Sequence, residues 1–326
     1  MAWSSIKLGD LISIKYGKDH KKLNDGNIPV FGSGGIMRYV DSKLYDGPSL
    51  LLPRKGTLNN VMFSDKPFWT VDTMFWSIID EKKVNPKFLY YAMCKKDLSL
   101  LNVGTSVPSL TVPVLQDIDI PYPPLDKQLL IASILSSLDA KIENNNKINA
   151  NLEAQAQALF KSWFVDFEPF QNGEFEDSEL GRIPKGWKVG TLGELIEVKY
   201  GKDHKRLPDG DIPVYGSGGL MRKVDRCLYN GESVLIPRKG TLNNVMYVNE
   251  AFWTVDTMFY SIMKQPRIAI FVYQFLIRKD LASMNAGSAV PSMTSDILNK
   301  MEIVIPPQSI LVVTGGCRYQ FSKTRF

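Results

Sequence analysis

The sequence predicts an α+β fold in which two similar, mostly-β domains are joined by one long coiled-coil-type helix. Residues 15–79 and 199–263 align without a gap, and 46 of the 65 positions are identical. Short runs rich in strand-forming residues alternate with turn residues inside each copy, which is typical of β structure. Between the copies, residues 126–165 contain neither glycine nor proline, which favours a continuous helix.

The repeat extends beyond this aligned block. Its offset of 184 residues falls to 183 at Gly104–Ser109, which matches Gly287–Ser292, and a double proline ends each copy at Pro123-Pro124 and Pro306-Pro307. Solenoid repeats run about 20–50 residues, so this period indicates a duplicated domain. Each copy should combine strands with one helix. In the first copy the expected strands lie at 28–35, 49–53 and 74–79; the expected helices are 86–98 and its mate 268–281.

The predicted connecting helix starts after the first double proline, with Asp126 as its N-cap. Its apolar residues recur at alternating spacings of four and three, a heptad seam with polar Asn145 and Asn149 at its centre. About 40 residues give a rod of about 60 Å. Its stripe has to be buried, either against the chain's own domains or against another helix. The main apolar seam residues are Ile131, Leu135, Leu138, Ile142, Leu152 and Leu159.

The composition is that of an ordinary globular protein, with 44% hydrophobic and 22% charged residues. No apolar run reaches the roughly 18 residues that span a bilayer, and the N-terminus lacks a signal-peptide pattern. Cys94, Cys227 and Cys317 have no pairing or metal-ligand spacing, so a reducing cytoplasm is the expected setting. The net charge of +5 permits a polyanionic partner without requiring one.

Signatures of catalysis are missing from the sequence. No phosphate loop of the Gly-x4-Gly-Lys-Ser/Thr type occurs, because Asp203 follows Gly201-Lys202. The two histidines, His20 and His204, occupy equivalent positions of the repeat, so a histidine metal site within one copy is not expected. Neither a methyltransferase motif of the Asn-Pro-Pro-Tyr type nor a nuclease carboxylate–lysine cluster is found. We expect a binding subunit without catalytic, metal or cofactor residues of its own.

Basic residues gather in the repeated block. Residues 15–60 contain eight lysines and arginines against four aspartates, and residues 199–244 contain nine against five acidic residues. Cationic side chains on loops beside glycine-rich turns suit contact with phosphate groups. The densest cluster, at 18–22 and 202–206, is either a DNA contact or a solvated loop. The candidate DNA contacts are Lys18, His20, Lys21, Lys22, Ser33, Arg38, Arg54, Lys55, Lys202, His204, Lys205, Arg206, Ser217, Arg222, Arg238 and Lys239.

Other repeated features have two interpretations each. The tetrapeptides Gly32–Gly35 and Gly216–Gly219 allow either close approach of a ligand or a tight turn. The Arg54-Lys55 and Arg238-Lys239 pairs each lie in a turn that follows an expected strand. They either contact DNA or belong to an ordinary turn. Histidines alone in loops are more often structural than base-reading. The Phe68-Trp69 pair and its repeat are more typical of a core than of a stacking platform.

Taken together, these residues resemble the specificity (S) subunit of Type I restriction-modification enzymes, over nearly the whole chain to about residue 310. The most specific element is an order: a domain, Pro123–Gln128, the helix with Leu138–Glu143, and then Leu159–Phe167. The last stretch, followed by Gly181–Trp187, is very similar to the family's central conserved region. The repeated Arg-Lys-Gly-Thr turns also fit its target-recognition domains.

The resemblance implies a non-catalytic subunit with target-recognition domains at residues 1–124 and 184–307. It also implies that the spacer helix at 125–166 docks modification (M) subunits, which use S-adenosylmethionine. Restriction (R) subunits would join to cleave double-stranded DNA with ATP and Mg. These cofactors would lie in the partner subunits.

The family also implies that a pseudo-two-fold relates the two recognition domains. Two similar readers so arranged would meet the same sequence on opposite strands. We therefore expect a split, near-palindromic target. The departures Asn27/Asp211, Tyr39/Lys223 and Ser42/Arg226 are candidates for a difference between the half-sites.

Two segments lie outside the repeat. Residues 166–182 carry six acidic residues and one arginine, so we expect a solvated acidic linker at 167–183. The tail at 308–326 stands where the family begins a second spacer helix. Its β-branched residues and Gly315-Gly316 oppose a helix, and no heptad continues. We expect the unpaired seam to cause self-association or poor assembly with the M subunit.

Two rival functions fit parts of the pattern. A standalone DNA-binding or anti-restriction decoy, or an inactive remnant, would bind DNA but would not support methylation with an M subunit. A duplicated carbohydrate-binding protein would be secreted and would expose aromatic platforms. The missing signal-peptide pattern argues against the second.

Overall fold

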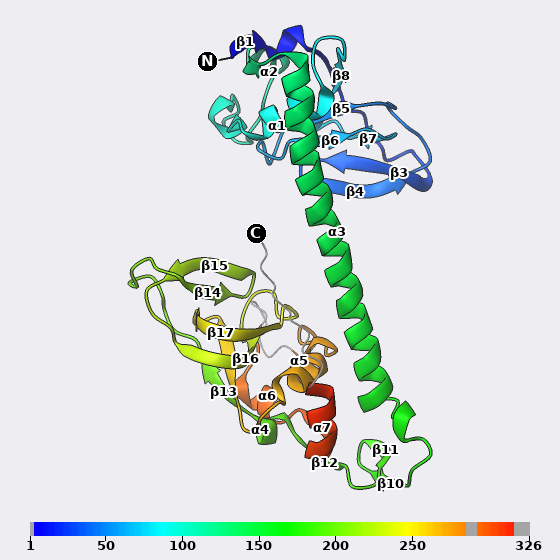
Figure 1. The fold of residues 1–326 in the computed structure, drawn as a ribbon, viewed down its shortest axis with the longest axis vertical. Coiled ribbons are helices and arrows are strands. Elements are labelled where there is room, and N and C mark those ends of the chain that lie inside the picture. The colour runs from blue at the N-terminus through cyan, green and yellow to red at the C-terminus, as the bar shows by residue number, and fades with distance from the viewer. Residues whose placement is uncertain (1–2, 285–291, 316–326) are drawn as a thin grey trace. The chain divides into compact units, whose positions relative to one another are not determined.

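The computed structural model of the protein describes residues 3–284 and 292–315 (Figure 1). The chain divides into two compact units, residues 1–149 and residues 150–326. Each unit contains one copy of the repeat, which confirms the expected α+β organisation. Of the repeated turn at Gly287–Ser292, all but Ser292 lies outside the described residues.

Unit 1 is built mostly from strands. Its strands are β1 (Ser4–Lys7), β2 (Ile12–Tyr16), β3 (Asp25–Gly32), β4 (Gly35–Val40), β5 (Ser49–Pro53), β6 (Met62–Ser64), β7 (Trp69–Thr70), β8 (Met74–Ile79) and β9 (Asp119–Tyr122). They form sheets of order β2-β8-β5-β6, β4-β3-β7 and β1-β9. Its short helices are α1 (Pro86–Cys94) and α2 (Val112–Gln116), with 3-10 turns at Leu8–Asp10 and Leu98–Leu101. Helix α1 confirms the predicted helix but ends four residues earlier.

Unit 2 repeats this plan. Its strands are β10 (Phe175–Ser178), β11 (Gly181–Pro184), β12 (Lys188–Thr191), β13 (Ile196–Tyr200), β14 (Ile212–Gly216), β15 (Gly219–Val224), β16 (Tyr229–Pro237), β17 (Met246–Thr254), β18 (Met258–Met263) and β19 (Glu302–Ile305). Six of them form one sheet of order β13-β18-β16-β17-β14-β15, and β12 pairs with β19. Its helices are α4 (Leu192–Leu195), α5 (Ala269–Ile277), α6 (Ser295–Asn299) and α7 (Gln308–Gly315), with a 3-10 turn at Glu168–Phe170.

Two prolines of unit 1, Pro48 and Pro67, stand where the continuous sheet of unit 2 has Glu232 in β16 and Ala251 in β17. Strand β17 runs unbroken through Ala251, whereas β6 and β7 are separated by a segment with Pro67 at the equivalent position. Proline cannot donate a backbone hydrogen bond to a neighbouring strand, so it interrupts a ladder. The hairpins β3–β4 and β14–β15 are nevertheless alike, because the register shifts at Val30/Phe31 in one and at Val214/Tyr215 in the other.

The two copies bury the same aromatic residues. Phe68 and Phe75 in unit 1, and Phe252 and Phe259 in unit 2, are among the largest fully buried side chains. Trp69 donates its indole N–H to the Lys18 carbonyl at 2.9 Å and packs, partly buried, against the cluster that contains Phe68. The expectation that the Phe-Trp pairs belong to the core is therefore confirmed.

Helix α3 (Leu125–Phe164) is the predicted connecting helix, 40 residues long. Asp126 lies in its first turn and is not its N-cap, because the Pro124 carbonyl already accepts the N–H groups of Lys127 and Gln128. The Gln128 side chain is buried, where it donates to the Pro123 carbonyl and accepts the Asn85 N–H, both at 2.9 Å. These contacts fix the start of the helix on unit 1.

The expected acidic linker at 167–183 has more structure than a solvated linker. Strands β10 and β11 form an antiparallel hairpin within it. Aromatic rings stabilise its base: the Trp187 ring lies 5.3 Å from Phe167 and 5.1 Å from Phe170, between ring centroids. Net acidity suggested a linker, but four aromatic residues between 163 and 170 supply the apolar contacts that order it.

The expectation that the tail opposes a helix is wrong for residues 308–315, which form α7. Leu311 is fully buried in the core of unit 2, and the Gln308 side chain donates to the Pro266 carbonyl at 3.1 Å. Tertiary packing of this kind overrides the weak helix propensity of β-branched residues. Residues 316–326 of the predicted tail, Cys317 included, lie outside the described residues.

Candidate nucleic-acid interface

Three basic or glycine-rich segments of unit 1 converge on one turn, Thr70–Thr73, which we call the hub turn. Its first carbonyl accepts the Lys18 N–H at 2.8 Å, and its last carbonyl accepts the Arg54 N–H at 2.9 Å. Between them, the Val71 N–H donates to the Phe31 carbonyl on strand β3 at 3.0 Å. Three segments are therefore held side by side: the basic loop at residues 18–22, the glycine hairpin formed by β3 and β4, and the turn at Arg54–Gly56, which we call the Arg54 turn.

Unit 2 has the same arrangement around residues Thr254–Thr257. The Lys202 and Arg238 N–H groups donate to the first and last carbonyls of this turn, both at 2.8 Å, and Val255 donates to the Tyr215 carbonyl at 3.1 Å. Both hub turns belong to the identical blocks Phe68–Phe75 and Phe252–Phe259. This identical block was the one sequence signal that could have pointed to the hub turn. The contacts themselves could not be predicted, because backbone carbonyls are common to all residues.

A glycine is required where the basic loop meets the hub turn. A Cβ atom on Gly17 would lie 2.0 Å from the Val71 carbonyl oxygen, and one on Gly201 would lie 2.0 Å from the Val255 oxygen. No side chain fits at such distances. The close approach brings the loops at 18–22 and 202–206 directly onto their hub turns.

The lysines of the basic loop and of the Arg54 turn remain available to a partner. Lys18, Lys21, Lys22 and Lys55 are exposed, and none forms a hydrogen bond or ion pair through its side chain with a described residue. The Asp19 carboxylate instead accepts the Lys21 backbone N–H at 3.1 Å, which holds the pKa of Asp19 below its usual value. The loop is thus shaped by its own backbone while its ammonium groups face solvent.

The cationic residues of unit 2 are equally available. Asp203 accepts the Lys205 N–H as Asp19 does in unit 1, and its pKa is lowered for the same reason. Among the predicted DNA contacts of unit 2, the exposed cations with no side-chain partner among the described residues are Lys202, Lys205, Arg206 and Lys239. Four predicted cations in each unit therefore lie on segments that are bonded to the hub turn, and none has a side-chain hydrogen bond or ion pair with a described residue.

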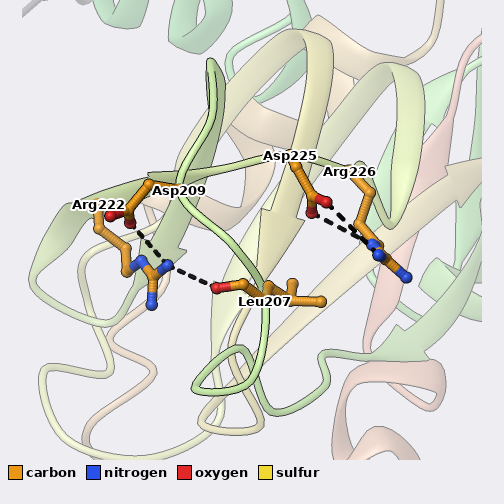
Figure 2. Close-up of polar contacts among 5 residues, drawn as sticks. All are labelled: Leu207, Asp209, Arg222, Asp225 and Arg226. Atoms are coloured by element: carbon orange, nitrogen blue, oxygen red, sulfur yellow. Dashed lines mark hydrogen bonds and ion pairs between the residues drawn. The ribbon is translucent and has the colours of Figure 1, made fainter.

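Arg222 braces the basic loop of unit 2. Figure 2 shows its guanidinium donating to the Asp209 carboxylate and to the Leu207 carbonyl, both at 2.8 Å. Arg38 makes the corresponding bonds in unit 1, to Asp25 at 2.6 Å and to the Leu23 carbonyl at 3.2 Å. Both arginines are about two-thirds buried. Sequence reasoning placed them among the DNA contacts, but much of their donor capacity holds the loop in place.

The two units satisfy one equivalent carboxylate by different means. In unit 1, Asp41 accepts hydrogen bonds from the Asn24 amide and the Ser42 hydroxyl, and both lower its pKa. In unit 2 a proline replaces the asparagine, and Asp225 instead pairs with Arg226 at 3.2 Å (Figure 2). The Ser42/Arg226 difference is therefore compensated within the fold, and the Arg226 charge is partly neutralised.

The second predicted arginine pair is also held by the protein. Arg54 donates to the Asp72 carbonyl at 3.1 Å, and its guanidinium lies 5.5 Å from the centre of the Tyr16 ring. Arg238 donates to the Asp256 carbonyl at 3.2 Å and lies 5.4 Å from the Tyr200 ring. Guanidinium over an aromatic face is an attractive arrangement. The lysines that follow these arginines are the exposed cations of each turn.

The glycine tetrapeptides form the tight turns of the two hairpins. The Ser33 carbonyl accepts the Asn60 side-chain amide at 2.9 Å, and a Cβ on Gly56 would lie 2.8 Å from the Ser33 hydroxyl. The tip of the hairpin thus lies against the Arg54-Lys55-Gly56 turn. The same contacts join Ser217, Asn244 and Gly240 in unit 2.

The histidines of the basic loops are half-buried. In both units the histidine Nδ1 atom is enclosed and has no hydrogen-bond partner among the described residues. The Thr70 and Thr254 hydroxyls of the hub turns share this property. Because the feature occurs twice, it belongs to the module and not to one copy.

The family comparison follows the duplication. The Type I restriction modification DNA specificity domain matches residues 2–154 and again residues 184–310. The chain belongs to the Type I specificity-domain family. The Type I restriction enzyme MjaIX specificity subunit of Methanocaldococcus jannaschii is 30% identical over 302 residues, which cover 82% of this chain and 69% of that protein.

Other members of the specificity family are also similar. A putative Type I restriction enzyme specificity subunit of Haemophilus influenzae is 25% identical over 307 residues, or 86% of this chain and 77% of that protein. The crystal structure of the S subunit from M. genitalium matches with a TM-score of 0.64 at 20% identity, over 96% of this chain and 87% of that one. This last likeness shows the fold.

The connecting helix of this specificity-family chain packs at both ends and is exposed in its middle. Of the six predicted seam residues, Ile131 packs against the core of unit 1, whereas Leu135 and Leu152 are half-buried. Phe160, which the seam did not include, is buried against Phe271 of unit 2. The remaining seam residues, Leu138, Ile142 and Leu159, are exposed.

Four exposed apolar residues at spacings of four form the exposed stripe of α3: Leu130, Ile134, Leu138 and Ile142. Residues four apart lie on one face of a helix. Unit 1, to which this stretch belongs, leaves these four side chains uncovered.

The described residues also limit other kinds of site. None of the helices that the structure describes is long and apolar enough to cross a membrane. Within the described ranges, no three His, Cys, Asp or Glu side chains gather in a way that could hold a metal ion.

Proposed function

We propose that this chain is the DNA sequence-recognition subunit of a Type I restriction-modification complex. The observation that carries the proposal is the duplicated hub turn, which gathers unpaired lysines, a glycine hairpin and an arginine turn in both units. Unpaired cations suit phosphate contact, and a rigid hairpin beside them suits reading of base edges. The names of the relatives agree with this role.

The target is a bipartite, near-palindromic DNA site, one half for each unit. Both units hold their loops through equivalent backbone bonds, so each presents the same arrangement of donors and cations to DNA. Similar readers related by a two-fold axis meet the same sequence on opposite strands. The exposed differences Tyr39/Lys223 and Asn27/Asp211 are the main candidates for unequal half-sites, because Ser42/Arg226 is compensated internally.

The exposed stripe of α3 docks the modification subunits, and restriction subunits join the resulting complex. Uncovered apolar faces of this kind mark interaction surfaces. The chain itself contributes binding and no catalysis. S-adenosylmethionine, ATP and Mg act in the partner subunits, and the complex works in the cytoplasm.

The test is co-expression of the chain with its cognate M subunit. We expect the two proteins to copurify and the host DNA to gain sequence-specific methylation. The variant Leu138→Glu/Ile142→Glu should lose copurification, whereas Ala140→Glu, at an exposed position on the opposite face of the same helix, should keep it. DNA binding without methylation would instead support the decoy or inactive remnant.

Self-association through the same stripe is a second use of this surface. An isolated helix face with four exposed apolar residues gains free energy when a second copy covers it. Light scattering of the purified chain should then report a dimer, which Leu138→Glu/Ile142→Glu converts to a monomer. A tight monomer before substitution would count against self-association.

A further inference from the structure

Two apolar side chains follow directly after the glycine turn of each hairpin and are exposed. Ile36 and Met37 are 51% and 60% exposed in unit 1, and Leu220 and Met221 are 54% and 57% exposed in unit 2. Single exposed apolar residues are common on protein surfaces. A pair at the same place in both copies, close to lysines that have no ion pair with a described residue, calls for a partner that covers it.

The methionine is held beside the hub turn. A Cβ atom on Gly32 would lie 2.5 Å from the Met37 sulfur and 3.8 Å from a Val71 methyl group. The thioether therefore lies across the glycine, next to the residue that anchors strand β3. In unit 2, Gly216 and Met221 repeat the 2.5 Å approach. Because Gly32 and Gly216 have no side chain, the Met37 and Met221 side chains can lie against the backbone there while they stay exposed.

The hairpin tip itself is braced. The Asn60 amide donates to the Ser33 carbonyl at 2.9 Å and contacts the Met62 sulfur at 3.9 Å. The tip also lies against Gly56, in the turn that carries Lys55. A pre-organised surface loses little conformational entropy when it binds, so even a small apolar contact contributes to affinity.

The surroundings of the apolar pair favour DNA as the occupant. The loop with Lys18, Lys21 and Lys22 and the turn with Lys55 are bonded to the same hub turn, and these cations have no side-chain partner among the described residues. A polyanion complements them. The major groove admits a two-stranded β-ribbon, and its one apolar base-edge group is the C5-methyl of thymine.

We propose that Ile36–Met37 and Leu220–Met221 contact thymine methyl groups in the major groove, one pair in each half-site. The inference rests on the proposed function and adds the identity of a base. The pair keeps its apolar character between the units, whereas Tyr39, two residues further along the same strand, becomes Lys223. Both half-sites should therefore contain thymine at the equivalent position. The contact that differs between the units, made by Tyr39 or Lys223, should fall on a neighbouring base pair.

The experiment uses the complex of the chain with its M subunit and a duplex that contains the methylated sequence. Each thymine of the site is replaced in turn by deoxyuridine, which pairs identically but lacks the methyl group. We expect one such replacement in each half-site to weaken binding about three- to fivefold, the effect of one buried methyl-sized group. In the variant Ile36→Ala/Met37→Ala, the replacement in one half-site should have no further effect, and Leu220→Ala/Met221→Ala should do the same for the other.

A control variant and three outcomes distinguish a failure of this inference from a failure of the proposed function. Ile78→Ala, an exposed isoleucine at the far end of strand β8 from Met74, should leave the deoxyuridine effect unchanged. A complex that binds no specific sequence would refute the proposed function. A complex that binds its site normally but shows no deoxyuridine effect, or whose half-sites lack thymine, would overturn this inference alone. Loss of M-subunit copurification in the hairpin variants would show that a protein covers the pair.

Discussion

Replacement of Lys18, Lys21 and Lys22 by alanine should reduce the salt dependence of DNA binding. These three ammonium groups are exposed and have no side-chain partner among the described residues, so each can neutralise one phosphate. The slope of log K against log salt changes by about 0.9 for each phosphate contact, which gives about 2.7 for three. Between 50 and 200 mM salt, the advantage of the unchanged protein over the variant should therefore shrink by about 40-fold.

The assay is equilibrium binding of the assembled complex to a duplex with its target, measured at several salt concentrations. The matched control is Lys66→Ala/Lys82→Ala/Lys95→Ala, which removes three other exposed lysines of unit 1. The control should keep the original slope. If both variants change the slope equally, the basic loop is not the phosphate-binding surface, and the hub turn loses its assigned role.

Three smaller predictions concern the fold around the hub. Gly17→Ala should destabilise unit 1 by about 2 kcal/mol, because the loop must move away from the hub and lose two hydrogen bonds; Gly34→Ala, with open space around it, should cost less than about 0.5 kcal/mol in the same urea titration. Ser77→Ala leaves the buried Leu50 N–H unpaired and should cost about 1–3 kcal/mol, and a neutral result would contradict the pairing. Because the pKa of Asp19 is lowered, its hydrogen bond with the Lys21 backbone N–H should survive as the pH falls through the usual aspartate range, and should be lost only as the pH falls through the lowered pKa. An NMR titration of the carboxylate that showed a raised pKa would be inconsistent with the loop geometry.

The sequence predicted the large features of the fold because they repeat. The duplication, the long helix and the packing of the Phe68-Trp69 pair into the core all follow from patterns that extend over many residues. The tail helix and the hairpin at 175–184 were missed because propensity and net charge describe a segment alone, whereas Leu311 and Trp187 stabilise them through packing with distant residues.

The candidate site was predicted in composition but not in geometry. The lysines at 18–22 and at 55 were found from their density, and the structure leaves them unpaired. The role of Arg38 could not be found, because Asp25 lies 13 residues away in the chain and only the hairpin brings the two together. Ile36 and Met37 were passed over because the expected strand ended at residue 35, whereas the structure continues the hairpin through β4.

The central claim is that the two units read the same DNA sequence on opposite strands. It is tested most directly by mapping the methylated positions in a cell that carries this chain with its M subunit. We predict a two-part site whose halves are inverted copies of each other, with thymine at the equivalent position and at most a difference beside it. Two unrelated half-sites would contradict the account.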